Sequence, residues 1–331
     1  MAISTVGCVS MLLLAVQFGL QPILYKEFAS GAKSSSALVI ACELCKLAIA
    51  CLVLVSSGDF VKLVKSWELQ QSLRASGLPA CTYAVQNVLV QISYQHLPPI
   101  VFNLINQTKL LWTALFVFVL LGTKFSRQQC GAMIVLLAAA VLLSLAKESS
   151  GSGKGAERAA DVSFELGLLP VLVASILSGF GAAITQRSMQ IQKRDPALVT
   201  VELSVYGSIF LVLPMLWSAL SPLSASSDNL EGSLSSWASL WDGCDALTLI
   251  PVVTNAFGGL LVGTVTKHVG GVLKSFALIC GIAFTAFVES YVYGAVLPLE
   301  VYVAAALVAF SLFLYSSYPY KEAAPAKKKT Q

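Results

Sequence analysis

Long apolar segments dominate this chain of 331 residues. Hydrophobic residues make up 56% of it and charged residues 11%, whereas soluble domains carry about 25% charged residues. A helix needs about 20 apolar residues to cross the roughly 30 Å of hydrocarbon in a bilayer. Ten such segments stand out, with approximate bounds 5–25, 34–55, 76–97, 100–122, 129–146, 163–185, 197–220, 246–267, 270–293 and 298–317. The sequence therefore predicts an all-α membrane protein with ten transmembrane helices.

Basic residues are distributed unevenly between the two predicted membrane faces. With an even number of spans both termini lie on one side, and Lys and Arg are enriched in cytosolic loops. Cytosolic termini place thirteen basic residues in the cytosol: Lys62, Lys65, Arg74, Lys124, Arg127, Arg187, Lys193, Arg194, Lys267, Lys321, Lys327, Lys328 and Lys329. Five remain on the opposite side: Lys26, Lys33, Lys147, Lys154 and Arg158. We therefore expect cytosolic termini.

No metal or cofactor site is predicted. Seven of the eight cysteines lie in apolar segments, where a disulfide framework is not expected. Cys42 and Cys45 on one apolar helix favour packing over metal binding. The two histidines, His96 and His268, each stand at a short break between spans.

An internal repeat organises the sequence. A shift of 172 residues aligns 79–122 with 251–294 without a gap and gives nine identities in 44 positions, including His96 with His268. Five spans per half force the two halves into opposite orientations, as in many secondary transporters. The predicted organisation is a first five-helix repeat at 1–146, a lumenal linker at 147–162, a second repeat at 163–317 and a cytosolic tail at 318–331.

Lys109 and Lys274 each lie in an apolar segment with no acidic residue three or four positions away. An unpaired charge at membrane depth costs about 2.5–3.5 kcal/mol on insertion scales, so it is usually functional. The two lysines predict a carrier whose central cavity accepts an anionic solute. The alternative is a structural pair with an acid on another helix, for which Glu202 and Glu289 are candidates. Glu43 and Lys46, three residues apart, predict a structural ion pair instead.

Polar residues cluster around these lysines. Such density suits a ligand with many hydroxyl and carbonyl groups, such as a nucleotide or a sugar, although polar groups also join helices in lipid. The residues predicted on this basis to bind substrate are Lys109, Lys274, Tyr83, Gln86, Asn87, Asn103, Asn106 and Asn255, and a resemblance described below adds Phe102 and Glu202.

Several segments resemble the signature segments of nucleotide-sugar transporters in the drug/metabolite transporter superfamily. They are Tyr83-Ala-Val-Gln-Asn87, Asn106-Gln-Thr-Lys-Leu-Leu-Trp-Thr-Ala-Leu-Phe116, Ser178-Gly-Phe180, Gly258-Gly-Leu-Leu-Val262 and Val272-Leu-Lys-Ser-Phe-Ala277. The resemblance covers 5–320 and is to the branch that carries CMP-sialic acid, UDP-galactose and UDP-N-acetylglucosamine. It implies exchange of a cytosolic nucleotide sugar for a lumenal nucleoside monophosphate by alternating access.

The resemblance also implies roles for individual residues. Lys109 and Lys274 match the family lysines that face the nucleotide phosphates. Tyr83, Gln86 and Asn87 match the polar motif of the third span, and Glu43 with Lys46 matches a Glu-x-x-Lys in the second. Phe102 and Asn106 occupy the part of span four where the family usually has a phenolic ring.

The seventh span departs from the family in a way that bears on the sugar. The sequence Val199-Thr-Val-Glu-Leu203 stands where the family usually has Arg-Asn-x-Gln-Leu. We expect the Glu202 carboxylate to repel an acidic sugar and to accept a neutral one. The plant-type subgroup that this chain resembles implies transport of UDP-N-acetylglucosamine and UDP-N-acetylgalactosamine. The alternatives are a Golgi transporter of CMP-sialic acid or UDP-galactose and, less favoured, a membrane-embedded glycosyltransferase; a homodimer stays open.

The C-terminal lysines bear on the compartment. Lys328 and Lys329 stand four and three residues from the end, which resembles the dilysine signal for retrieval from Golgi to endoplasmic reticulum; an ordinary basic flank is the alternative. We predict residence in the endoplasmic reticulum membrane with cycling through the Golgi. Replacing both lysines by serine should move a fluorescent fusion toward the Golgi without changing transport in liposomes. An unchanged distribution would rule out the signal.

Overall fold

The computed structural model describes residues 4–32, 35–58, 60–97, 99–150, 164–220, 242–294 and 297–320, and these residues form helices and no strand. The long helices are α1 (Thr5–Phe28), α2 (Ser35–Ser56), α5 (Leu78–His96), α8 (Arg127–Ser150), α9 (Leu169–Gln190), α10 (Pro196–Leu220), α12 (Leu249–His268), α13 (Gly271–Tyr293) and α14 (Leu299–Ser317). Helices α6 (Pro99–Gln107) and α7 (Lys109–Leu121) follow each other across Thr108. Short turns are α3 (Phe60–Lys65), α4 (Leu69–Ser72), η1 (Leu73–Gly77), η3 (Phe164–Leu168) and η5 (Ala246–Thr248).

The chain is a multi-pass membrane protein. Within the described residues, eight helical segments are long and apolar enough to cross a bilayer. Each of the ten segments predicted from sequence falls on helix, but α5 and α10 are not among those eight. Helix α5 carries several polar residues. The described part of the chain therefore supports an all-helical membrane protein, and the count of ten stays a prediction.

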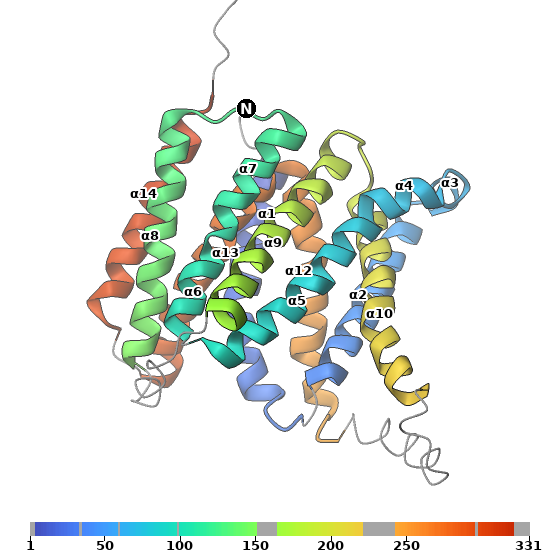
Figure 1. Cartoon of the computed structure of the whole chain (residues 1–331), viewed down its shortest axis with the longest axis horizontal. Helices are drawn as coiled ribbons and strands as arrows, with labels where there is room; N and C mark the ends of the chain where they lie inside the picture. Colours follow the sequence, from blue (N-terminus) through green and yellow to red (C-terminus); the bar gives the residue numbers. More distant parts are fainter. Residues whose placement is uncertain are drawn as a thin grey trace, which may run out of the picture.

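The long helices run side by side as a bundle (Figure 1). Helix α1 packs on α12 and α13, α9 packs on α5 and α7, and α2 packs on α10. Helices α8 and α14 pack on each other at one side of the bundle. The largest apolar cluster joins α8, α13 and α14 around Leu136, Phe276 and Val308, which are almost fully buried.

Glycines bring two pairs of helices into backbone contact. A Cβ on Gly19 of α1 would lie 2.6 Å from the carbonyl oxygen of Gly281 on α13. A Cβ on Gly179 of α9 would lie 2.7 Å from the backbone nitrogen of Thr113 on α7. Only hydrogen fits at these points, which is the usual reason for small residues between membrane helices. The helices that carry the two lysines, α7 and α13, are therefore each fixed by a close contact.

Short breaks precede both of these helices. At Thr108 the chain makes a tight turn, because the Thr108 amide donates to the Ile105 carbonyl at 2.9 Å, three residues back. Between α12 and α13 the break is Gly270, whose φ of 89° lies in the region that favours glycine. Lys109 and Lys274 thus lie in the first turns of α7 and α13.

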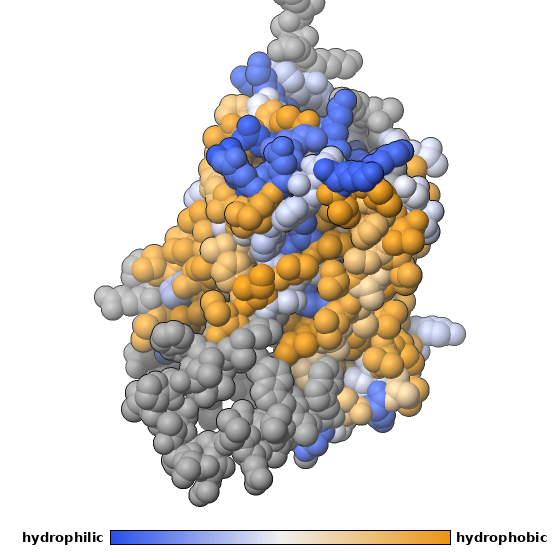
Figure 2. All heavy atoms as spheres, turned by 90° about the vertical axis from the view of Figure 1, so that its right-hand side faces the viewer, coloured by the Kyte–Doolittle hydropathy of each residue, from blue (hydrophilic) through white to orange (hydrophobic). Residues whose placement is uncertain are grey.

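Helix α3, the α7–α8 turn and the α9–α10 turn all lie at the same end of the bundle (Figure 1). We call this the basic end; it carries Lys62, Lys65, Arg127, Arg187 and Lys193. Figure 2 shows hydrophilic residues concentrated there, above a broad apolar belt. The predicted charge asymmetry is therefore present in the fold.

The structure describes only part of the predicted lumenal linker and of the cytosolic tail. The predicted linker began at 147, but α8 continues to Ser150, so its first four residues are helical. The remainder of that linker and the tail with Lys328 and Lys329 lie outside the described residues.

Candidate functional site

A cavity of about 790 Å³ lies between α2, α5, α7, α9, α10, α12 and α13. Pockets that enclose small organic ligands have volumes of about 300–1,000 Å³, so its size suits such a ligand. Exposed apolar side chains line its mouth on three helices: Val39, Val85, Val88 and Phe210. The interior combines small and apolar residues with lysines, an acid, amides and hydroxyl groups.

Lys109 and Lys274 both line this cavity and are both half-buried. The sequence prediction that they face one cavity is therefore confirmed. Among the residues that the structure describes, neither ammonium group has an ion-pair partner. The two groups are close enough to repel each other. Each also lies near the positive end of its helix dipole, which adds to the attraction for an anion.

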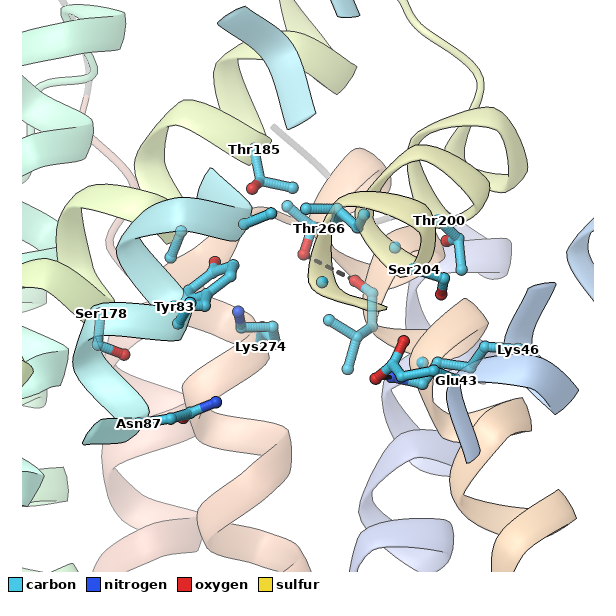
Figure 3. A pocket seen from close by; sticks show the side chains of 18 of the residues that line it. Glu43, Lys46, Tyr83, Asn87, Ser178, Thr185, Thr200, Ser204, Thr266 and Lys274 are labelled. Atoms are coloured by element: carbon cyan, nitrogen blue, oxygen red, sulfur yellow. Dashed lines mark hydrogen bonds and ion pairs between the residues drawn. The ribbon is translucent and has the colours of Figure 1, made fainter. Parts of the chain in front are cut away.

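Polar side chains of α5 lie beside these lysines. Figure 3 shows the Lys274 amino group next to the Tyr83 ring, with Asn87 one turn further along the same helix. Tyr83 and Asn87 line the cavity, as predicted, because they are four residues apart and share a face of α5. Together these residues make one side of the cavity positively charged and rich in hydrogen-bond donors.

The predicted ion pair between Glu43 and Lys46 is confirmed, with 2.5 Å between the Lys46 Nζ and a Glu43 carboxylate oxygen. Its location was not predicted: both residues line the cavity, on the side opposite Lys274 and Tyr83 (Figure 3). The Lys46 side chain passes over Gly259 of α12, where a Cβ would lie 2.7 Å from its Cδ. The pair neutralises its own charge, so the uncompensated charge of the cavity is that of Lys109 and Lys274.

Six predicted site residues do not line the cavity: Gln86, Phe102, Asn103, Asn106, Glu202 and Asn255. Phe102 is 1% exposed and packs against Leu97 and Val171. Helix α6 packs on α8 and α9, and none of its described side chains lines the cavity, because they are used in that packing. Gln86 lies on the neighbouring face of α5, and its Oε1 is buried without a partner among the described residues.

Glu202 also differs from its prediction. It is 5% exposed and lies outside the cavity. Its carboxylate accepts hydrogen bonds from Arg194 Nη2 at 2.5 Å, from Trp67 Nε1 at 2.8 Å and from Ser76 Oγ at 2.6 Å. The alternative in which Glu202 pairs with Lys109 or Lys274 is therefore wrong, because the cation that Glu202 contacts is Arg194. We call these four residues the clamp: Trp67, Ser76, Arg194 and Glu202.

Hydroxyl residues are the part of the site that sequence reasoning missed. Thr200 and Ser204 of α10 and Thr266 of α12 face the cavity beside the Glu43–Lys46 pair (Figure 3). Each threonine hydroxyl also donates to the carbonyl four residues back, as is common in helices. The spacing of Thr200, Ser204 and Gly207 on one face of α10 was the available signal.

Comparison with known proteins identifies the family. A family model described as nucleotide-sugar transporter matches residues 3–316. The chain belongs to the nucleotide-sugar transporter family. The protein is therefore a member of a family of transporters, and the membrane-enzyme alternative is not supported.

Several relatives are similar along most of their length. The chain is 38% identical over 309 residues to the UDP-N-acetylglucosamine transporter ROCK1 of Arabidopsis thaliana, covering 93% of this chain and 91% of that protein. It is 27% identical to the UDP-N-acetylglucosamine transporter of Homo sapiens, covering 89% and 88%. It is 27% identical to the UDP-N-acetylglucosamine/UDP-N-acetylgalactosamine transporter nstp-4 of Caenorhabditis elegans, covering 86% and 84%.

The fold also matches a solved structure. A protein crystal structure with 13% sequence identity superposes with a TM-score of 0.62 and covers 94% of this chain and 96% of that one. At this identity the likeness concerns the fold alone.

The position of Glu202 leads to a prediction. Glu202→Gln should lower the melting temperature in detergent, because removing one member of a buried ion pair costs about 3–5 kcal/mol. It should leave the ranking of competing nucleotide sugars unchanged, because Glu202 does not line the cavity. Glu68→Gln, an exposed change at the same end of the bundle, is the control and should alter neither property.

If Glu202→Gln does not fold, the double variant Glu202→Leu with Arg194→Met removes both charges and permits the same ranking test. A changed ranking of the competing nucleotide sugars in either variant would show that Glu202 contributes to substrate selection.

Proposed function

We propose that this protein exchanges a cytosolic UDP-N-acetylhexosamine for a lumenal nucleoside monophosphate by alternating access. The observation that carries the proposal is the pair of uncompensated ammonium groups, Lys109 and Lys274, in one cavity of a nucleotide-sugar transporter. Phosphate groups supply the counter-charge that these lysines lack. The nucleoside monophosphate that returns carries the same kind of charge, so one site serves both substrates.

The packing of the helices supports two inverted repeats of five helices. When the two halves are exchanged, α1 corresponds to α9, α2 to α10, α5 to α12, α6 and α7 to α13, and α8 to α14. The contacts exchange accordingly: α1 packs on α12 and α13, as α9 packs on α5 and α7. Helix α1 begins at the basic end and α9 begins at the other end (Figure 1), as opposite orientations require.

Equivalent positions of the repeat also share local structure. Gly122 and Gly294 both end their helices with φ values of 68° and 65°. His96 and His268 each donate from Nδ1 to the carbonyl four residues back, at 2.8 and 2.9 Å. These likenesses favour the inverted ten-helix arrangement of the drug/metabolite transporter fold and, with the basic end facing the cytosol, cytosolic termini.

The clamp supports alternating access, because it joins the two halves. Trp67 and Ser76 come from the first half, and Arg194 and Glu202 from the second. Ser72 and Tyr206 add a hydrogen bond of 2.9 Å at the same place. In the proposed orientation this junction holds the cytosolic ends of α5 and α10 together. Entry of a nucleotide sugar from the cytosol therefore requires the clamp to open.

The names of the relatives support an N-acetylhexosamine as the sugar. The charge argument from Glu202 no longer does, because Arg194 neutralises that carboxylate outside the cavity. CMP-sialic acid and UDP-galactose therefore belong in the test as competitors. Residence in the endoplasmic reticulum rests on Lys328 and Lys329.

Exchange in liposomes tests the proposal. Purified protein in vesicles loaded with UMP should take up labelled UDP-N-acetylglucosamine, and external UDP-N-acetylgalactosamine should compete better than CMP-sialic acid. Lys109→Gln and Lys274→Gln should each weaken apparent affinity more than tenfold, because a hydrogen bond to a charged group contributes about 1.5–3 kcal/mol.

Lys65→Gln, an exposed lysine on α3, is the matched control and should exchange like the wild type. Wild-type exchange by both cavity variants would contradict the phosphate assignment. Absence of exchange with every nucleotide sugar, from correctly folded protein, would contradict the function itself.

A further inference from the structure

Gln186 reaches from α9 to the break between α12 and α13. Its side chain is buried, and its Oε1 accepts a hydrogen bond from the Gly271 amide at 2.8 Å. Its Nε2 donates to Gln190 Oε1 at 2.9 Å. Gln190 Nε2 in turn donates to the carbonyls of Thr266 and Lys267, at 3.0 and 3.2 Å. The two amides therefore hold the end of α12 and the beginning of α13 in one network.

The start of α13 needs such a partner. The first amides of a helix have no acceptor within the helix and are usually capped by the side chain of the residue before it. Here that residue is Gly270, which has no side chain. Gln186 therefore supplies from a different helix the cap that the local sequence lacks.

Gln186 also leaves no room for a side chain at Gly270, between α12 and α13. A Cβ on Gly270 would lie 2.8 Å from Gln186 Nε2. On the other side of the hairpin, a Cβ on Gly271 would lie 3.1 Å from Thr113 Cγ2 of α7. The first residues of α13 are thus held between Gln186 and the helix that carries Lys109.

Lys274 depends directly on this hairpin. Its amide donates to the Gly270 carbonyl at 3.1 Å, so the first turn of α13 runs from the capped glycines to the lysine. Lys109 and Lys274 carry like charges in one cavity and therefore repel each other. A loose first turn would let the repulsion move Lys274 away from the place where both lysines reach one ligand.

We propose that Gln186 is a positioning residue for phosphate binding: by capping α13 it holds Lys274 opposite Lys109, although it does not itself line the cavity. This inference rests on the proposed function, because it assumes that the lysines bind phosphate. It assigns a role in substrate affinity to a residue outside the binding site.

Binding of UMP and of uridine to the purified protein separates positioning from general stability. The two ligands differ only by the phosphate, so the ratio of their dissociation constants reports the phosphate contact alone. In the wild type UMP should bind more than tenfold tighter than uridine. Gln186→Met, of similar size but without the amide, should reduce that ratio about tenfold and leave the affinity for uridine unchanged.

Gln129 offers a matched control. Its Oε1 also accepts a hydrogen bond from a backbone amide at a helix start, that of Ser126 at 3.0 Å, and its side chain is buried, but it lies in the first turn of α8 and does not line the cavity. Gln129→Met should leave the UMP-to-uridine ratio unchanged. In a Lys274→Gln background, Gln186→Met should cause no further loss, because the residue acts through Lys274.

The proposal is overturned if Gln186→Met leaves the ratio unchanged, or if it reduces the ratio equally with and without Lys274. If Gln186→Met does not fold, Gln190→Met removes the bond that orients the Gln186 amide, and an unchanged ratio there overturns the proposal as well. Equal binding of UMP and uridine by the wild type would instead refute the phosphate assignment on which the inference rests.

Discussion

Two like charges without counter-charges, on Lys109 and Lys274, are the constraint on which the account of this protein depends. In a membrane each costs about 2.5–3.5 kcal/mol on insertion scales, and in one cavity they also repel each other. An anion that binds between them removes both penalties while it is bound. Because the penalties return when the anion leaves, a site of this kind is suited to binding and release.

The rest of the bundle keeps these charges in place. The helix of Lys109 is fixed by the backbone contact between Gly179 and Thr113, and the helix of Lys274 by the contact between Gly19 and Gly281. Gln186 adds a hydrogen bond to the Gly271 amide at the start of α13. The clamp also joins the two halves, at the basic end, where Trp67 and Ser76 of the first half donate hydrogen bonds to Glu202 of the second.

Much of the fold could be predicted because a bilayer imposes simple rules on sequence. Apolar length located the helices, and the Lys and Arg distribution located the basic end. Lys109, Lys274, Tyr83 and Asn87 line one cavity; a lysine without a local acid is a strong signal, and helical spacing determines which residues share its face.

The misses have local causes. The face of α6 was wrong because this helix packs on α8 and α9, and spacing along one helix does not reveal which neighbours it contacts. Glu202 was misassigned because two of its three partners, Trp67 and Ser76, are 135 and 126 positions away. Its cation, Arg194, comes from a turn that sequence reading treated only as a basic loop. Hydroxyl residues such as Thr200 carry little signal, because they are also common where helices merely pack.

An experimental structure of the protein with bound UMP tests the central claim most directly. The account predicts that the phosphate lies between the side-chain nitrogens of Lys109 and Lys274, within hydrogen-bond distance of both, with the Tyr83 ring beside it. A phosphate bound elsewhere in the cavity, for example at Lys46 with both central lysines free, would contradict it.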